Sequence, residues 1–326
     1  MKLNRAEVRI YSILLDSRRR HTLTQLAKIA NMKKSNTSRY VKKLKKFGLL
    51  NLSKVGRKLE IYASHTHFLN FSKVKEQLSH LKIEDLLIGK MPHFLAYLHW
   101  YVRKQLNQRK SVVFNISDIH LPAITTRRLL NKLSSIGIVY RPSNGCYSTR
   151  KEAREAMRFC NDILTEMYFA ESEHELKGIL RMLISFENPE KAECVFITET
   201  KITSKNYWPT AYTPLHEFGV QLISDGKYYY TNIKPKLVDI IIHILALDRS
   251  SDLVTPISAA DARTIMYVAV LLLKNKFEYK KLLKKENKFG ISDAFLMALI
   301  EFVTSKGTKT YERFPTWSEV EGVLNG

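Results

Sequence analysis

The chain has 326 residues, 45% of them hydrophobic, and carries a net charge of +22, which indicates a polyanionic partner. It shows no secretory leader and no apolar stretch long enough to span a bilayer, and its three cysteines have neither metal-ligand spacing nor a paired framework. These features argue against a membrane protein and a disulfide-stabilised secreted domain, and we expect a cytoplasmic protein of about two or three domains.

The positive charge is confined to the first 150 residues. Residues 1–65 hold 17 Lys and Arg against 3 Asp and Glu, a net of +14, and residues 66–150 hold 13 against 4, a net of +9. Residues 151–326 hold 23 against 24, a net of −1. A general basic bias would spread the charge along the chain, so this distribution predicts a nucleic-acid-binding half joined to a neutral half.

The first predicted domain, residues 1–65, has the signals for three helices followed by a hairpin. Helices are expected over 4–16, 24–32 and 35–47, and two apolar stretches then flank a basic, Gly-containing tip at 54–58. Thr22 or Thr24 is expected to cap the second helix. Helix, helix, helix, hairpin is the order of a winged helix-turn-helix, in which one helix enters the DNA major groove.

The helix at 35–47 is expected to have one packed face and one exposed basic face. The side chains expected to pack inward are Thr37, Val41 and Leu44. Ser35 can cap the N-terminus, and Gly48 can end the helix in a left-handed conformation. The outward side chains are Ser35, Asn36, Arg39, Lys42, Lys43 and Lys46. We interpret this segment as a recognition helix for double-stranded DNA, with a solvated basic face on an ordinary helix as the alternative.

Two of these side chains are suited to reading bases. Asn36 can bond adenine, and Arg39 can bond guanine O6 and N7, each through two hydrogen bonds. The cations expected to meet phosphates are Lys42, Lys43, Lys46, Lys54, Arg57 and Lys58. Phosphate contacts of this kind predict an affinity for DNA that falls steeply with salt.

The stretch TLTQLAKIANMKKSNTSRYVKKLKKFGLL and the hairpin after it resemble the winged helix-turn-helix of the MarR-like regulators, over about 60 residues. The resemblance implies that the helix at 35–47 lies in the groove and that the basic hairpin reaches the adjacent phosphates.

The pattern recurs in the second predicted domain, residues 66–150. A shift of 89 residues places Thr37 on Thr126 and Arg39 on Arg128. Helices are expected within 66–90, over 92–106 and over 123–135, with a short strand and helical turn over 112–119 and a wing tip at 141–145. The outward residues are Thr125, Arg127, Arg128, Asn131, Lys132 and, in the wing, Arg141. We predict a second winged helix, and a copy kept for protein contacts is the alternative.

Residues 151–326 are expected to be α+β at the start and helical at the end. Helices are expected over 151–170 and 171–186, a strand over 194–200, strand-like runs including 220–224 and 227–232, and helices from 235 onward. The aromatic run at 228–230 is a candidate stacking surface, and strand packing on both faces is the alternative. Asp239 and His243 share a helix face, and we expect His243 to be a satisfied core group.

The helical tail resembles the C-terminal domain of the AbiEi family of abortive-infection antitoxins. The resemblance lies in the apolar spacing of residues 233–245, 262–275 and 278–303. It implies that residues 151–326 hold a nucleotidyltransferase-like toxin and that the DNA-binding part represses its own promoter.

No phosphate-cradling Gly-rich loop, nucleophile elbow, zinc-protease motif or paired-Asp nuclease pattern is present, so we expect neither an enzyme nor a cofactor or metal. The predicted fold is α+β, mainly α, with tandem winged helix-turn-helix domains followed by an α-rich C-terminal domain at 151–326. The predicted function is a sequence-specific regulator of transcription, in the first place a repressor. An antitoxin and a tandem winged-helix replication initiator are the alternatives, and a homodimer or a toxin bound through 151–326 are the protein partners considered.

Overall fold

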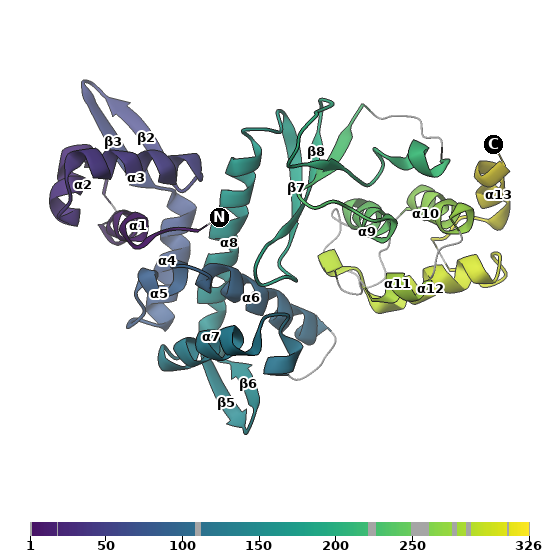
Figure 1. Ribbon diagram of the computed structural model, residues 1–326, viewed down its shortest axis with the longest axis horizontal. Helices are drawn as coiled ribbons and strands as arrows, with labels where there is room; N and C mark the ends of the chain where they lie inside the picture. Colours follow the sequence, from purple (N-terminus) through teal and green to yellow (C-terminus); the bar gives the residue numbers. More distant parts are fainter. Residues whose placement is uncertain are drawn as a thin grey trace. The chain divides into compact units, whose positions relative to one another are not determined.

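The computed structural model describes residues 2–17, 19–107, 112–220, 226–248, 261–275, 279–284, 288–311 and 313–325. In this part of the chain the fold is α+β and mainly helical, and the paired strands form small antiparallel sheets (Figure 1). The packing divides the chain into two units. Unit 1 comprises Met1–His174 and Phe186–Ala192, and unit 2 comprises Glu175–Ser185 and Glu193–Gly326.

Unit 1 begins with the first helix–hairpin motif. Its elements are α1 (Arg5–Ser17), β1 (His21–Thr22), α2 (Leu23–Ala30), α3 (Lys34–Lys46), β2 (Leu50–Val55) and β3 (Lys58–Ala63). The strands pair in the order β1–β3–β2. Thr22 caps α2 in a capping box with Gln25, as predicted, and Asn31 ends it with a left-handed φ of 51° that turns the chain toward α3.

Helix α3 confirms the predicted helix with one change at its start. The N-cap is Lys33, which is extended and makes no side-chain capping bond, so Ser35 lies exposed in the first turn. The prediction that Ser35 caps the helix is therefore wrong. Gly48 follows α3 with a φ of 74°, as predicted. The apolar face is buried and packs against α1 and α2, with Leu44 wholly inaccessible to solvent.

The second helix–hairpin motif repeats this arrangement further along unit 1. Its elements are α6 (Met91–Asn107), β4 (Val113–Asn115), the 3₁₀ turn η1 (Ile116–Asp118), α7 (Ala123–Ser135), β5 (Val139–Ser143) and β6 (Cys146–Thr149). Helix α7 begins and ends 89 residues after α3. Thr126, Leu130 and Leu133 are buried like their counterparts in α3, and Gly137 has a φ of 76°. Where the first motif has α2, the second has only η1.

Helix α8 (Arg154–Ser172) packs against the second motif and against the helices that connect the two motifs. It follows the turn η2 (Lys151–Ala153) and contacts α6 and also α4 (His65–Gln77) and α5 (Ile83–Leu87), which connect the motifs. A ring contact of 5.5 Å between Phe71 and Phe159 joins α4 to α8. The predicted domain boundary at residue 151 thus lies inside unit 1, because the buried face of α8 belongs to its core.

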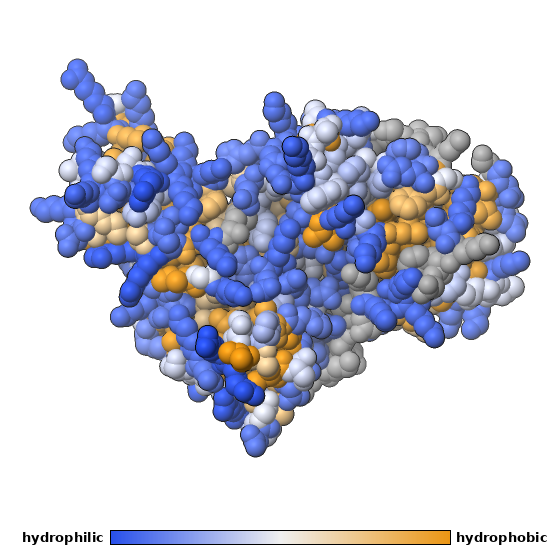
Figure 2. Space-filling model, in the orientation of Figure 1, coloured by the Kyte–Doolittle hydropathy of each residue, from blue (hydrophilic) through white to orange (hydrophobic). Residues whose placement is uncertain are grey.

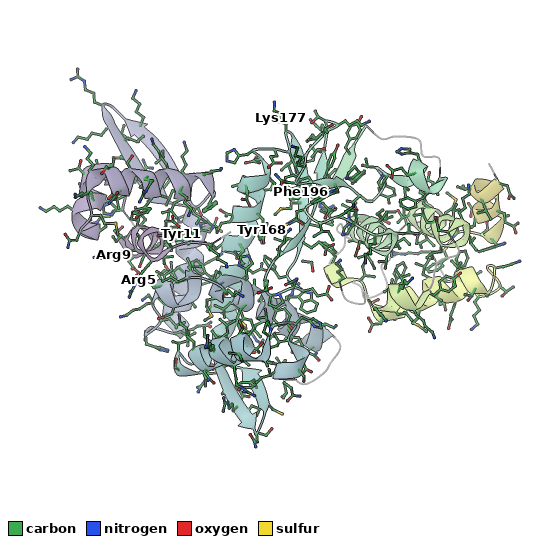
Figure 3. The ribbon with its side chains drawn as sticks, viewed as in Figure 1. Arg5, Arg9, Tyr11, Tyr168, Lys177 and Phe196 are labelled. Atoms are coloured by element: carbon green, nitrogen blue, oxygen red, sulfur yellow. The ribbon has the colours of Figure 1, made fainter. Side chains whose placement is uncertain are left out.

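A chain of polar contacts joins α1, α4 and α8 in the same core. His67 Nδ1 lies 2.8 Å from Tyr11 Oη, and His67 Nε2 lies 2.9 Å from Glu166 Oε1. Burial, together with the nearby Glu166 carboxylate, raises the pKa of Tyr11 well above its ordinary value, so its hydroxyl stays protonated. Tyr11 faces this core, whereas Arg5 and Arg9 lie on the exposed side of α1 (Figure 3).

Unit 2 places a four-stranded sheet beside a group of helices. The strands are β7 (Ile179–Ser185), β8 (Glu193–Thr198), β9 (Trp208–Pro209) and β10 (Tyr228–Thr231), in the order β7–β8–β10–β9. The helical elements are η3 (Leu215–Phe218), α9 (Leu237–Asp248), α10 (Ala262–Lys274), α11 (Tyr279–Leu283), η5 (Lys288–Gly290), α12 (Asp293–Thr304) and α13 (Trp317–Asn325).

The helices and most strands predicted for unit 2 are confirmed, with one correction. The helix expected over 171–186 is wrong, because α8 already reaches Ser172 and residues from Ile179 form β7, which pairs with β8. The run expected at 220–224 lies, after Val220, outside the described residues. The core of the unit is formed by the apolar side chains of α9, α10 and α12.

A buried polar cluster lies within this core. Lys288 Nζ lies 2.7 Å from Glu193 Oε2 and 3.3 Å from Asp239 Oδ1. His243 Nε2 lies 2.7 Å from Glu193 Oε1, and its Nδ1 lies 2.6 Å from Thr210 Oγ1. A neutral imidazole satisfies both bonds by donating to Glu193 and accepting from Thr210. The prediction that His243 is a satisfied core group is confirmed.

Candidate nucleic-acid interface

The exposed face of α3 carries only basic and neutral polar side chains. The helix KSNTSRYVKKLKK has no acidic residue, and Lys45 and Lys46 lie in its last turn, where positive charge is favourable beside the C-terminal carbonyls. The exposed residues are Lys34, Ser35, Asn36, Arg39, Lys42, Lys45 and Lys46. Sequence reasoning omitted Lys34 and Lys45, although Lys45 stands beside Lys46, which was selected.

The start of α3 is also electropositive. Lys33 makes no side-chain capping bond, and the first turn contains no carboxylate to occupy the amide groups that lack helical partners. Exposed backbone N–H groups at a helix N-terminus attract anions such as phosphate. The start of α3 therefore adds to the positive potential of its side chains.

Arg39 and Asn36 lie exposed on this face. Arg39 donates to Tyr40 Oη at 3.2 Å and its guanidinium lies 5.0 Å from the centre of the Tyr40 ring. Within the described part of the chain, no carboxylate lies within ion-pair distance of Arg39, Lys42 or Lys46. Stacking on Tyr40 restricts the conformations of the Arg39 guanidinium without neutralising its charge. The guanidinium therefore keeps N–H groups that can donate hydrogen bonds to a partner.

Lys43 differs from its neighbours because its charge is already paired. Its ammonium lies 2.8 Å from Glu7 Oε1, and the side chain of Glu7 is only 2% exposed. Asn4 also donates to Glu7 Oε1, at 2.8 Å. Lys43 was predicted to meet phosphate, but the structure places it in the packing between α3 and α1.

The hairpin β2–β3 ends in the predicted basic tip. Val55 pairs with Lys58, and Gly56, with a φ of 58°, begins the two-residue turn between them. The exposed cations of the tip are Lys54, Arg57 and Lys58. Glu60, the acidic residue of this hairpin, pairs with Arg20 at 3.4 Å, so it does not oppose the charge of the tip. Sequence reasoning gave Arg20 no role.

The second motif presents a weaker version of the same surface. On α7, Arg127, Arg128, Asn131 and Lys132 are exposed and Thr125 is half-buried. Lys132 Nζ lies 3.9 Å from Asp85 Oδ1. In the wing, the exposed Arg141 donates to Asn131 Oδ1 at 3.0 Å and covers the ring of Tyr147.

The two helix faces therefore differ in charge and polarity. The position of Ser35 in α3 corresponds to Ile124 in α7, which is 66% exposed. In Figure 2 the surface over α3 and the hairpin β2–β3 is mostly hydrophilic, whereas more apolar surface is visible around α7. The structure thus places the densest unpaired positive charge of the two motifs on α3 and its hairpin.

A scan of protein-family models and a search of curated proteins both find no match to this chain. Among the described residues, no helix is long and apolar enough to cross a membrane, and no three His, Cys, Asp or Glu side chains are arranged to hold a metal ion. The assignment of function therefore depends on the geometry and charge of unit 1.

Proposed function

We propose that the protein is a sequence-specific regulator of transcription that binds double-stranded DNA. The observation that carries the proposal is the exposed face of α3, where Asn36 and Arg39 stand among lysines without carboxylate partners in the described structure. A helix in the major groove needs this combination, because cations hold the phosphates while amide and guanidinium groups read base edges.

The arrangement around α3 supports a winged helix-turn-helix. Helix α2, the left-handed residue Asn31 and α3 follow one another, and α1 packs behind both helices. The hairpin β2–β3 then extends a basic tip that can meet phosphates beside the groove. We interpret the second motif as a second winged helix, built on α7.

The two motifs have unequal roles in this proposal. Helix α3 supplies most of the affinity, because four of its lysines are exposed and, among the described residues, Lys43 alone of its lysines is paired with a carboxylate. Helix α7 has fewer cations, so it adds less electrostatic affinity. A regulator with this design represses transcription by occupying a promoter with the first motif while the second extends the contacted sequence.

The proposal is tested by selecting bound DNA from a random duplex pool with the full chain at about 150 mM salt. An enriched motif is expected, and it should be lost in the variant Lys42→Gln/Lys46→Gln. The matched variant Arg127→Gln/Arg128→Gln makes the same change in charge on α7 and should shorten the motif while keeping its main part. Selection of no motif by the folded wild-type chain would overturn the proposal of sequence-specific binding.

For residues 151–326 we propose a partner other than DNA. Their balance of 23 basic and 24 acidic residues provides no net attraction for a polyanion. An antitoxin is the second candidate function, in which these residues bind a protein and the α3 surface serves autoregulation. Co-purification of a nucleotidyltransferase-like protein that depends on residues 151–326 would support it.

A further inference from the structure

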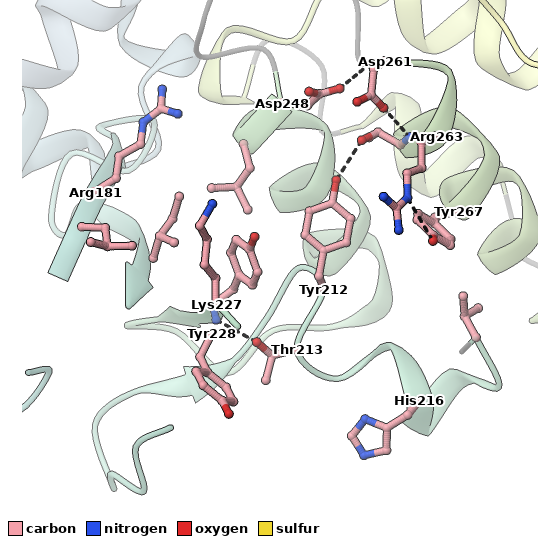
Figure 4. Close-up of a pocket in the computed structure, with 16 residues that line it drawn as sticks. Arg181, Tyr212, Thr213, His216, Lys227, Tyr228, Asp248, Asp261, Arg263 and Tyr267 are labelled. Carbon is pink, nitrogen blue, oxygen red and sulfur yellow. Dashed lines mark hydrogen bonds between the residues drawn. The ribbon is translucent and has the colours of Figure 1, made fainter. Parts of the chain in front are cut away.

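Unit 2 contains a cavity of about 740 Å³. Its walls come from β7, β8 and β10 of the sheet, from the loop before η3, from the end of α9 and from the start of α10 (Figure 4). Cavities of this size suit small organic ligands, whose sites typically have volumes of about 300–1,000 Å³. The described residues that line the cavity all belong to unit 2, and none of them belongs to the α3 surface.

Basic side chains reach the cavity from three separate elements. Arg181 belongs to β7, Lys227 immediately precedes β10, and Arg263 lies in the first turn of α10. Arg263 donates to Tyr267 Oη at 3.2 Å, and within the described residues no carboxylate lies within ion-pair distance of it. Figure 4 shows Lys227 and Arg263 on either side of Tyr212. These side chains supply charged donors suited to an anion.

Tyrosine rings form much of the remaining wall. Tyr212, Tyr228, Tyr229 and Tyr267 line the cavity, and Tyr212 meets Tyr229 edge to face with 5.3 Å between ring centres. Tyr212 Oη lies 2.8 Å from Thr264 Oγ1, and burial raises the pKa of its phenol. Successive residues of β10 point to opposite faces of the sheet, so Tyr228 lies at the margin of the cavity and its ring points away from Tyr212 (Figure 4). Tyr212 is half-buried, and an aromatic face of this kind stacks on planar rings.

The two carboxylates at the cavity are engaged by the start of α10. Asp261 Oδ1 accepts from the backbone N–H of Thr264 at 2.7 Å, and Asp248 accepts from the backbone N–H of Asp261. Burial raises the pKa of Asp248. The Asp261 carboxylate has lone pairs beyond this bond that can accept from a ligand hydroxyl or amino group. The cavity thus offers cationic donors, aromatic faces and hydrogen-bond acceptors together.

We propose that this cavity binds a nucleoside phosphate, a ligand with a planar ring, hydroxyl groups and several negative charges. Lys227 and Arg263 hold the phosphates, the ring lies against Tyr212, and the carboxylate of Asp261 accepts from hydroxyl or amino groups of the ligand. The proposal concerns unit 2 alone and does not depend on DNA binding by unit 1.

The test is calorimetric titration of the full chain with ATP, with adenosine and tripolyphosphate as the ring-only and charge-only probes. The basic surface of unit 1 can also adsorb ATP, so the variants must separate the two surfaces. Lys227→Gln/Arg263→Gln alters the cavity, and Lys42→Gln/Lys46→Gln makes the same change in charge on α3. Arg263→Lys keeps the charge at the cavity and serves as the conservative variant.

ATP should bind the wild type at one site, with adenosine and tripolyphosphate each binding at least about tenfold more weakly. The cavity variant should lose at least about tenfold in affinity, while the α3 variant binds as the wild type does and Arg263→Lys retains most of the affinity. Absence of ATP binding would overturn the proposal. It would also be overturned by equal loss in the two double variants, or by tripolyphosphate binding as tightly as ATP. Thermal melts of each variant exclude a folding defect, and Tyr212→Leu provides a second cavity variant.

Discussion

Lys43 of α3 and Glu7 of α1 form an ion pair with 2.8 Å between Nζ and Oε1. The carboxylate is almost fully buried and also accepts from the side chain of Asn4. Lys42, the next residue back, points to solvent. Two adjacent lysines of the same helix thus differ in role: Lys43 stabilises the packing of α3 on α1, and Lys42 faces the proposed partner.

Lys43→Ala should lower the free energy of unfolding by about 1–3 kcal/mol, because it leaves the Glu7 carboxylate buried without its cation. Lys42→Ala should change that free energy by less than about 0.5 kcal/mol. It should instead lower the slope of log affinity for DNA against log salt concentration by about the amount that one phosphate contact contributes. Urea denaturation and DNA titration over a salt series measure the two effects. A stability loss in Lys42→Ala equal to that in Lys43→Ala would contradict this division of tasks.

Arg39→Ala should relax the base preference of the protein, at a cost of about 1–3 kcal/mol on the preferred sequence and little on random DNA. Lys58→Ala, at the hairpin tip, should instead weaken binding to all sequences alike. Competition titrations with selected and random duplexes separate the two outcomes. Equal effects of both substitutions on both kinds of DNA would argue that Arg39 reads no base.

Gly48→Ala should destabilise unit 1 more than Gly56→Ala does. Both glycines have a left-handed φ, so each substitution costs about 1 kcal/mol in backbone strain. At Gly48 a new Cβ would also lie 3.3 Å from the Cβ of Ala170 in α8, whereas at Gly56 it would meet nothing within 4 Å. Urea midpoints of the two variants give the difference. Equal midpoints would mean that α8 does not approach the end of α3 this closely.

The stability of unit 2 should fall in acid because of its buried polar cluster. Burial lowers the pKa of His243, although its bond to Glu193 acts in the opposite direction. The unfolded chain therefore takes up the His243 proton first, and stability declines as pH falls below 6.5, the ordinary value of histidine. Burial alone would raise the pKa of Glu193, but His243 and Lys288 together lower it, so its contribution is lost as pH falls below 4.5.

The substitution His243→Gln isolates the first of these contributions. The variant lacks the histidine titration, so its stability deficit relative to wild type should shrink as pH is lowered from 7.5 to 5. Denaturant unfolding at several pH values provides the measurement, with Asp239, Lys288 and Thr210 left in place around the site. A deficit that stays constant over this interval would show that His243 takes up its proton equally in both states.

Local sequence signals were sufficient for much of unit 1. The spacing of Thr37, Val41 and Leu44 and the glycine after the helix located α3, and the shift of 89 residues located α7 to the residue. The pairing of Lys43 could not be predicted, because it depends on how α1 packs across α3, and sequence spacing carries no information on that contact.

The errors made for residues 151–326 also come from contacts between residues that are distant in the chain. The apolar run at 179–185 fits a helix or a strand, and only its pairing with β8 decides between them. The cluster of Lys288, Glu193 and His243 joins residues 45 or more positions apart in the chain, and only His243 was singled out beforehand. The aromatic run at 228–230 was interpreted as a stacking surface or as strand residues packed on both faces. Tyr229 and Tyr230 are buried, which fits strand packing, while Tyr228 is half-buried at the cavity.

The shared support of α8 has a consequence for the geometry of any DNA site. Helix α8 contacts α6 of the second motif and lies against Gly48 of the first, so both motifs pack on the same helix, and this packing sets the spacing of α3 and α7. Each base pair inserted between two contacted sequences turns the second by about 35° around the duplex axis. If both helices read bases, the fixed distance between α3 and α7 requires a fixed spacing between the two contacted DNA sequences. Binding should then tolerate a base change within one contacted sequence better than one extra base pair between the two sequences.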